Sequence, residues 1–118
     1  MHTASPFPMV QPKDEQELIK PAVDGTLAAM RAAQQHKVKR VVVTSSMAAK
    51  MNKVDRNHVH ITADDWSELE ACGSAYEKSK TMAERAAWDF VAALPENEKF
   101  ELSVVTHLPP TLIFNPPV

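Results

Sequence analysis

A run of β-branched residues, Val41-Val-Val-Thr44, constrains the fold of this 118-residue chain more than any other stretch. Apolar and polar side chains do not alternate along the run, so both faces of the strand are expected to be covered. Such strands belong to parallel sheets between layers of helices, and these sheets present polar groups at the carboxyl ends of their strands. The run therefore predicts a strand over residues 38–44 that leads directly to the hydroxyls of Ser45 and Ser46.

A helix is predicted before this strand. Pro21 is tolerated in the first turn of a helix, which places the helix over about residues 20–35. Its apolar residues recur at intervals of three and four, and they predict a buried stripe of Val23, Leu27, Met30 and Ala33.

A second helix is predicted to begin at Ala75, because Ser74 and Glu77 have the S-x-x-E spacing of a capping box. It would end at about Leu94 and lead into a further strand over residues 100–106. A strand-helix-strand unit of this spacing has parallel strands and a right-handed crossover. With a strand end expected in residues 1–8, the sequence predicts an α/β fold in the order strand, helix, strand, helix, strand. Residues 1–118 would form part of one doubly wound parallel-sheet domain.

The first turn of the second helix carries Tyr76, and Lys80 follows one turn later on the same face. The helix N-terminus and the ammonium group of Lys80 both favour the ionised phenol, which suits a group that exchanges protons. The pair continues an apolar stripe, so it is expected to face the strand ends. A Tyr-x-x-x-Lys spacing alone is a weak signal, and a surface pair without function is the alternative.

Five segments, in the same order along the chain, resemble the extended short-chain dehydrogenase/reductases, most closely the dihydroflavonol reductase and cinnamoyl-CoA reductase-like branch. The segments are His2-Thr-Ala-Ser-Pro6, Ile19-Lys-Pro-Ala-Val-Asp-Gly-Thr26, Arg40-Val-Val-Val-Thr-Ser-Ser46, Tyr76-Glu-Lys-Ser-Lys-Thr-Met-Ala-Glu84 and Pro110-Thr-Leu-Ile-Phe-Asn-Pro116.

The resemblance implies a Rossmann-type nucleotide-binding domain that transfers a hydride between NADP(H) and a small-molecule ketone, aldehyde or thioester. NAD is the alternative cofactor, and a sugar-nucleotide epimerase or a steroid dehydrogenase is the alternative activity. The catalytic residues that it implies are Ser46, Tyr76 and Lys80. The cofactor contacts that it implies are Ala4, Ser5, Pro6, Thr44, Tyr76, Lys80, Pro110 and Leu112.

The chain departs from the family in its glycines. It has only Gly25 and Gly73, so it cannot form the glycine-rich loop with which the family binds the pyrophosphate. The family's C-terminal substrate domain has no counterpart either. We therefore expect the isolated chain to be inactive, and a non-catalytic fragment or interaction module is the second hypothesis. A sheet cut at this point has an exposed edge, which predicts self-association.

Composition argues against several other classes of function. A net charge of −2 gives no basic surface for nucleic acid or anionic membranes, and no apolar run is long enough to span a bilayer. The single cysteine, Cys72, cannot form an internal disulfide, which favours the cytoplasm, and a packed side chain is favoured over a reactive thiol. His58 and His60 lack a third ligand nearby, so no metal site is predicted.

Overall fold

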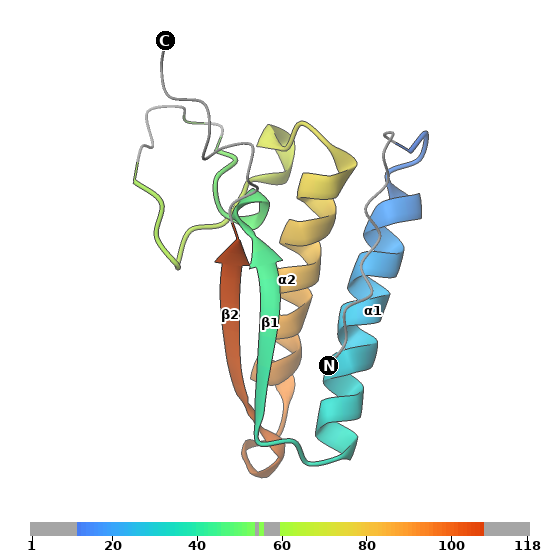
Figure 1. Cartoon of the computed structure of the whole chain (residues 1–118), viewed down its shortest axis with the longest axis vertical. Helices are drawn as coiled ribbons and strands as arrows, with labels where there is room; N and C mark the ends of the chain where they lie inside the picture. Colours follow the sequence, from blue (N-terminus) through green and yellow to red (C-terminus); the bar gives the residue numbers. More distant parts are fainter. Residues whose placement is uncertain (1–11, 54, 56–59, 108–118) are drawn as a thin grey trace.

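The computed structural model of the chain describes residues 12–53, 55 and 60–107 (Figure 1). Two helices, two strands and short 3-10 turns alternate in this part of the chain, as predicted for an α/β fold. The predicted strand end in residues 1–8 lies outside the described residues. The main elements are α1 (Gln16–Gln35), β1 (Arg40–Ser46), α2 (Ala75–Ala93) and β2 (Glu101–His107).

The two strands form a parallel pair, in a register that runs from Arg40 opposite Glu101 to Ser46 opposite His107. Helix α2 connects them. Figure 1 shows α2 behind the sheet and β2 to the left of β1, which is the predicted right-handed crossover. The carboxyl ends of both strands and the N-terminus of α2 lie at the same end of the molecule (Figure 1). This end is where a site built from strand ends and the start of α2 would lie.

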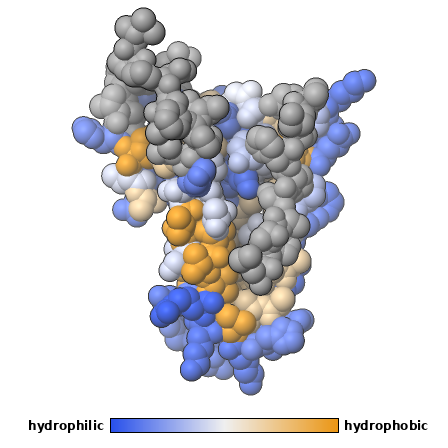
Figure 2. Space-filling model, viewed as in Figure 1, coloured by the Kyte–Doolittle hydropathy of each residue, from blue (hydrophilic) through white to orange (hydrophobic). Residues whose placement is uncertain are grey.

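Within the described residues, the helices cover only one face of the sheet, so the expectation that both faces are covered is wrong for this part of the chain. Exposure alternates along β1, and Val42 is 61% exposed. Val105 on β2 is 55% exposed. Figure 2 shows apolar side chains gathered over the strands on this open face. The parallel pairing is as predicted, but the burial is one-sided because both helices pack on the opposite face.

The core lies between that opposite face and the helices. Its buried centre consists of Met30, Ala33, Ala87 and Phe100. Around it pack partly buried residues from β1, β2 and α2, namely Val41, Val43, Phe90, Val91, Leu94 and Leu102.

Helix α1 begins four residues earlier than predicted. Asp14 accepts a hydrogen bond from the backbone N–H of Gln16 at 2.9 Å, and Leu18 and Ile19 are buried in the first turn. Pro21 therefore lies in the second turn, where it removes one helical hydrogen bond, and its predicted first-turn position is wrong. The predicted stripe is only partly confirmed. Met30 and Ala33 are buried, whereas Val23 and Leu27 are only half-buried.

Strand β1 begins two residues later than predicted, because residues 37 and 38 still belong to the turn that ends α1. Lys37 has a φ of 51°, in the left-handed region, and the N–H of Val38 donates to the carbonyl of Ala33 at 2.9 Å. At its other end the strand extends two residues beyond the predicted end and includes both Ser45 and Ser46. The predicted bounds of α2 and β2 agree with the structure to within one residue at each end.

Candidate functional site

The start of α2 is fixed by the predicted capping box. The hydroxyl of Ser74 accepts from the N–H of Glu77 at 3.2 Å, and the carboxylate of Glu77 accepts from the N–H groups of Ser74 and Gly73 at 3.1 and 2.6 Å. These bonds satisfy N–H groups that a helix otherwise leaves without partners. They also place Tyr76 in the first helical turn, as predicted.

Tyr76 and Lys80 are in direct contact. The ammonium nitrogen of Lys80 lies 5.6 Å from the centre of the Tyr76 ring, within the range of a cation–π interaction. Both side chains are half-buried. Burial lowers the pKa of Lys80 below its usual value, because the charged amine loses hydration. The contact joins a phenol and an amine at the positive end of a helix.

Ser46 is the last residue of β1 and is buried. Its hydroxyl accepts from the N–H of Ala48 at 3.2 Å, which caps the 3-10 turn Met47–Ala49. That turn packs against α2, the helix that carries Tyr76 and Lys80.

Of the other predicted cofactor contacts, only Thr44 lies within the described residues. Thr44 lies in β1 with an exposed side chain. The remaining positions lie outside the described residues, and they are Ala4, Ser5, Pro6, Pro110 and Leu112. His58 also lies outside them, and the described residues contain no cluster of three metal-binding side chains.

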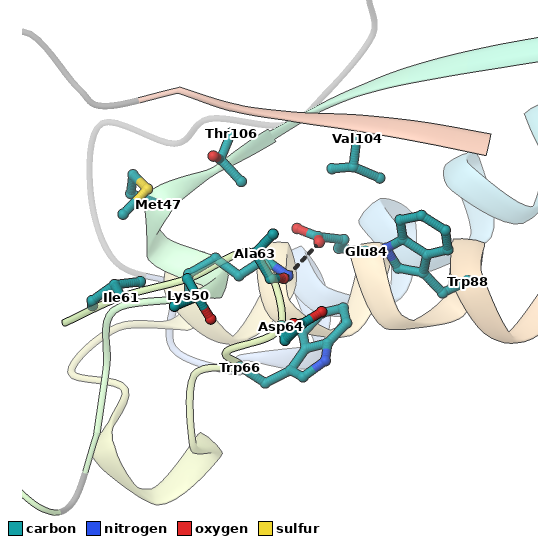
Figure 3. Close-up of a pocket in the computed structure, with 11 residues that line it drawn as sticks. Met47, Lys50, Ile61, Ala63, Asp64, Trp66, Glu84, Trp88, Val104 and Thr106 are labelled. Atoms are coloured by element: carbon teal, nitrogen blue, oxygen red, sulfur yellow. Dashed lines mark hydrogen bonds and ion pairs between the residues drawn. The ribbon is translucent and has the colours of Figure 1, made fainter. Parts of the chain in front are cut away.

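A buried ion pair that the sequence analysis did not predict lies beside Ser46. The amine nitrogen of Lys50 lies 2.8 Å from one carboxylate oxygen of Glu84 (Figure 3). The two side chains are only 6% and 1% exposed. The second carboxylate oxygen of Glu84 accepts from the hydroxyl of Ser45 at 2.5 Å. We call these three residues the carboxylate clamp.

Two further contacts surround Lys50. Its amine donates to the carbonyl of Ala63 at 3.1 Å and lies 3.8 Å from the centre of the Trp66 ring. Trp66 also faces Arg85, whose guanidinium carbon is 5.2 Å from the ring centre. Trp66 thus anchors its loop against two cations, Lys50 and Arg85. The position of Glu84 was a usable signal, because an acidic residue one turn beyond Lys80 on an apolar stripe is rarely buried without a partner.

A cavity of about 540 Å³ lies beside the clamp. Figure 3 shows Trp66 and Asp64 on one side of it and Val104 and Thr106 of β2 on the other. Its walls include Lys50, Glu84 and Trp88, but not Ser46, Tyr76 or Lys80. This cavity among the described residues is therefore separate from the predicted catalytic groups.

Cys72 is half-buried, close to the start of α2. Burial, followed by the nearby carboxylate of Glu77, raises the pKa of the Cys72 thiol above its usual value. Its sulfur accepts a weak hydrogen bond from the Asn52 side chain at 3.9 Å. These properties fit the predicted packing role better than a reactive thiol.

Comparison with known proteins shows which family the chain resembles. Residues 1–104 match the 3-beta hydroxysteroid dehydrogenase/isomerase family. The NADPH-dependent methylglyoxal reductase of Saccharomyces cerevisiae is 35% identical over 127 residues, which cover 98% of this chain and 36% of the yeast protein. An anthocyanidin reductase of Vitis vinifera is 35% identical over 92% of this chain and 32% of its own length. The dihydroflavonol 4-reductase of Arabidopsis thaliana is 35% identical over 98% of this chain and 30% of its own length.

Solved structures give the same result. The yeast methylglyoxal/isovaleraldehyde reductase complexed with NADPH has a TM-score of 0.74 and 32% identity, over 91% of this chain and 34% of the yeast chain. The chain spans about a third of the length of these relatives. The resemblance to dihydroflavonol reductase-like proteins and the partial Rossmann-type fold are thereby confirmed. In no described helix is there a stretch long and apolar enough to cross a membrane. The chain belongs to the 3-beta hydroxysteroid dehydrogenase/isomerase family.

Proposed function

We propose that this chain provides the proton-transfer site of an NADPH-dependent reductase that converts a carbonyl group of a small molecule to an alcohol. The observation that carries the proposal is the Tyr76–Lys80 contact in the first turns of a capped helix, at the same end of the fold as the strand that ends in Ser46. The relatives support it, since they include NADPH-dependent reductases and one was solved with NADPH.

Each residue has a distinct role in this proposal. Tyr76 donates its proton to the alkoxide that forms, a contribution of about 10²–10⁴ in rate for general acid catalysis. Ser46 donates a hydrogen bond to the carbonyl oxygen and stabilises its developing negative charge. Lys80 holds the ribose hydroxyls of the nicotinamide half of the cofactor next to Tyr76.

The residues fit one half of the cofactor. A phenol, a serine hydroxyl and a half-buried amine are donors suited to a ribose and a carbonyl oxygen. NADPH supplies the hydride when it is bound. Neither glycine belongs to a loop that could bind the pyrophosphate half. Gly25 lies inside α1, and Gly73 directly precedes the Ser74 cap of α2. We therefore propose that these residues act only together with a separate pyrophosphate-binding segment.

A chimeric enzyme tests the proposal. Residues 1–118 replace the matched third of the yeast methylglyoxal reductase, which then provides the remaining parts of the fold. The chimera is expected to oxidise NADPH in the presence of methylglyoxal. Ser46→Ala should lower kcat by about 10²–10³ while the Kd for NADPH changes less than about twofold. Lys78→Met is the matched control, because Lys78 also lies on α2 but pairs with Glu15 outside the proposed site.

The absence of a glycine-rich loop from the sequence favours a second candidate, a non-catalytic module of the same fold. A chimera that folds and binds NADPH but does not turn over would support this candidate and reject the first. For either candidate, we place the protein in the cytoplasm, consistent with its single, half-buried cysteine.

We also propose that the isolated chain self-associates through its sheet. Within the described residues, β1 and β2 pair only with each other, so each has one edge without a neighbouring strand. The exposed apolar side chains of Val42 and Val105 lie on the open face of the same sheet. Unpaired edges and apolar faces both promote association between copies.

A further inference from the structure

The carboxylate of Glu84 binds the chain on both sides of Ser46. One of its oxygens accepts from the hydroxyl of Ser45, the residue before Ser46, at 2.5 Å. The other pairs with Lys50, four residues after Ser46, at 2.8 Å. The segment from Ser46 to Ala49 is therefore tied to α2 at both of its ends by a single side chain.

This arrangement also determines the direction of the Ser46 side chain. Ser45 directly precedes Ser46, so the bond that holds the Ser45 hydroxyl on Glu84 also fixes the backbone from which the Ser46 side chain projects. The hydroxyl of Ser46 then reaches the N–H of Ala48 at 3.2 Å and begins the 3-10 turn. Loss of the Ser45 bond would allow the strand end to rotate, and the Ser46 hydroxyl would lose its defined position.

Glu84 lies on the same helical stripe as the proposed catalytic pair. It follows Lys80 by four residues and Tyr76 by eight, so the three side chains succeed one another along one face of α2. We infer that Glu84 and Lys50 are positioning residues, which set the hydroxyl of Ser46 relative to Tyr76 and Lys80. The inference rests on the proposed function only for the role of Ser46 in carbonyl reduction.

The contacts argue for positioning rather than for a direct part in the chemistry. Lys50 is occupied by Glu84, the carbonyl of Ala63 and the face of Trp66. Both oxygens of Glu84 are occupied as well, and no buried side-chain polar atom among the described residues lacks a partner. Each charged group of the clamp thus already has partners within the fold, which favours a positioning role.

Stability alone does not account for the pair. Removing two charges from water is costly, and replacing a buried ion pair by apolar residues of similar size is often neutral or stabilising. What an apolar pair could not provide is the directional bond to Ser45, because only an acceptor on α2 can fix that hydroxyl. The clamp therefore specifies a geometry that apolar packing would leave free.

Amide hydrogen exchange on the 118-residue chain tests the inference. The amide of Ala48 reports directly on the Ser46 hydroxyl, and the amide of Val38, bonded to Ala33 at the opposite end of β1, serves as the reference. Lys50→Met/Glu84→Leu removes both charges and the acceptor for Ser45. We expect the exchange rate of Ala48, divided by that of Val38, to rise about tenfold. Ser45→Ala, which leaves the ion pair intact, should produce a similar rise.

The double variant separates positioning from stability. If its urea midpoint recovers most of the loss caused by Lys50→Met while the exchange ratio of Ala48 to Val38 stays raised, the clamp positions Ser46. A wild-type exchange ratio at Ala48 in both variants would overturn the inference. Lys20→Met/Asp24→Leu, which removes an exposed ion pair on α1, should leave the ratio unchanged.

Turnover in the chimeric reductase provides a second measurement. Lys50→Met/Glu84→Leu should lower kcat by about 10²-fold through misplacement of Ser46, with the Kd for NADPH unchanged. A wild-type kcat in this variant would also overturn the inference. An inactive chimera with unmodified residues 1–118 would count against the proposed function alone, because the exchange measurement does not depend on turnover.

Discussion

Removing the positive charge of the carboxylate clamp should have a large effect on folding. Lys50→Met keeps the length and apolar stem of the side chain but leaves Glu84, only 1% exposed, without its cation. Breaking a buried ion pair from one side costs about 3–5 kcal/mol. Against a typical stability of about 5–15 kcal/mol, this is a large fraction. For a domain of this size it corresponds to a fall of about 10–25 °C in Tm.

Urea denaturation, followed by the fluorescence of Trp66 and Trp88, measures this loss. Lys50→Met/Glu84→Leu should recover most of it, since the remaining defect is the Ser45 hydroxyl without an acceptor, which costs about 1–3 kcal/mol. The control is Lys20→Met, because Lys20 and Asp24 form a pair whose side chains are 71% and 58% exposed. The control should lose less than about 1 kcal/mol. A loss that small for Lys50→Met, or a double variant as unstable as the single one, would refute the reasoning.

Three smaller effects follow from other contacts. Ser74→Ala removes one half of the capping box and should lower the free energy of unfolding by about 0.5–2 kcal/mol in urea denaturation. The carboxylate of Asp65 accepts a hydrogen bond from the backbone N–H of Thr62 at 2.8 Å and pairs with the amine of Lys53 at 3.0 Å. These contacts, the Thr62 bond most of all, hold the pKa of Asp65 well below its usual value. The stability that this provides is present above the unfolded value of 3.8 and is lost as the pH falls through the folded pKa, so Asp65→Asn should be less stable than wild type at neutral pH and equal to it in strong acid. On size-exclusion chromatography the isolated chain should elute as oligomers, and a sharp monomer peak would contradict association through the sheet.

Local signals in the sequence predicted most of the fold. The capping box at Ser74 and Glu77 fixed the start of α2 correctly, because both of its hydrogen bonds are made between near neighbours. The start of β1 was missed by two residues, since the left-handed conformation of Lys37 has no glycine to reveal it. The start of α1 was missed because Leu18 and Ile19, buried by tertiary packing, carry the helix one turn upstream of Pro21.

The part of the candidate site that depends on near neighbours in the sequence was also predictable. Tyr76 and Lys80 meet because a spacing of four on a helix brings side chains together, which needs no tertiary information. The clamp depends on partners 34 and 39 residues apart in the sequence, Lys50 with Glu84 and Ser45 with Glu84. No local pattern connects such positions. A carboxylate on the apolar stripe of α2 could have indicated that a buried partner exists, but not which residue it is.

The central claim is that Tyr76, held next to Lys80 at the start of α2, transfers the proton in carbonyl reduction. The most direct measurement compares kcat for Tyr76→Phe and unmodified residues 1–118 in the chimeric reductase, with NADPH binding measured in parallel. Turnover should fall by about 10²–10⁴, with NADPH binding nearly unchanged, because the ring is retained and only the hydroxyl is lost. A Tyr76→Phe enzyme that keeps more than about a tenth of its turnover would contradict the assignment, because general acid catalysis contributes more than that.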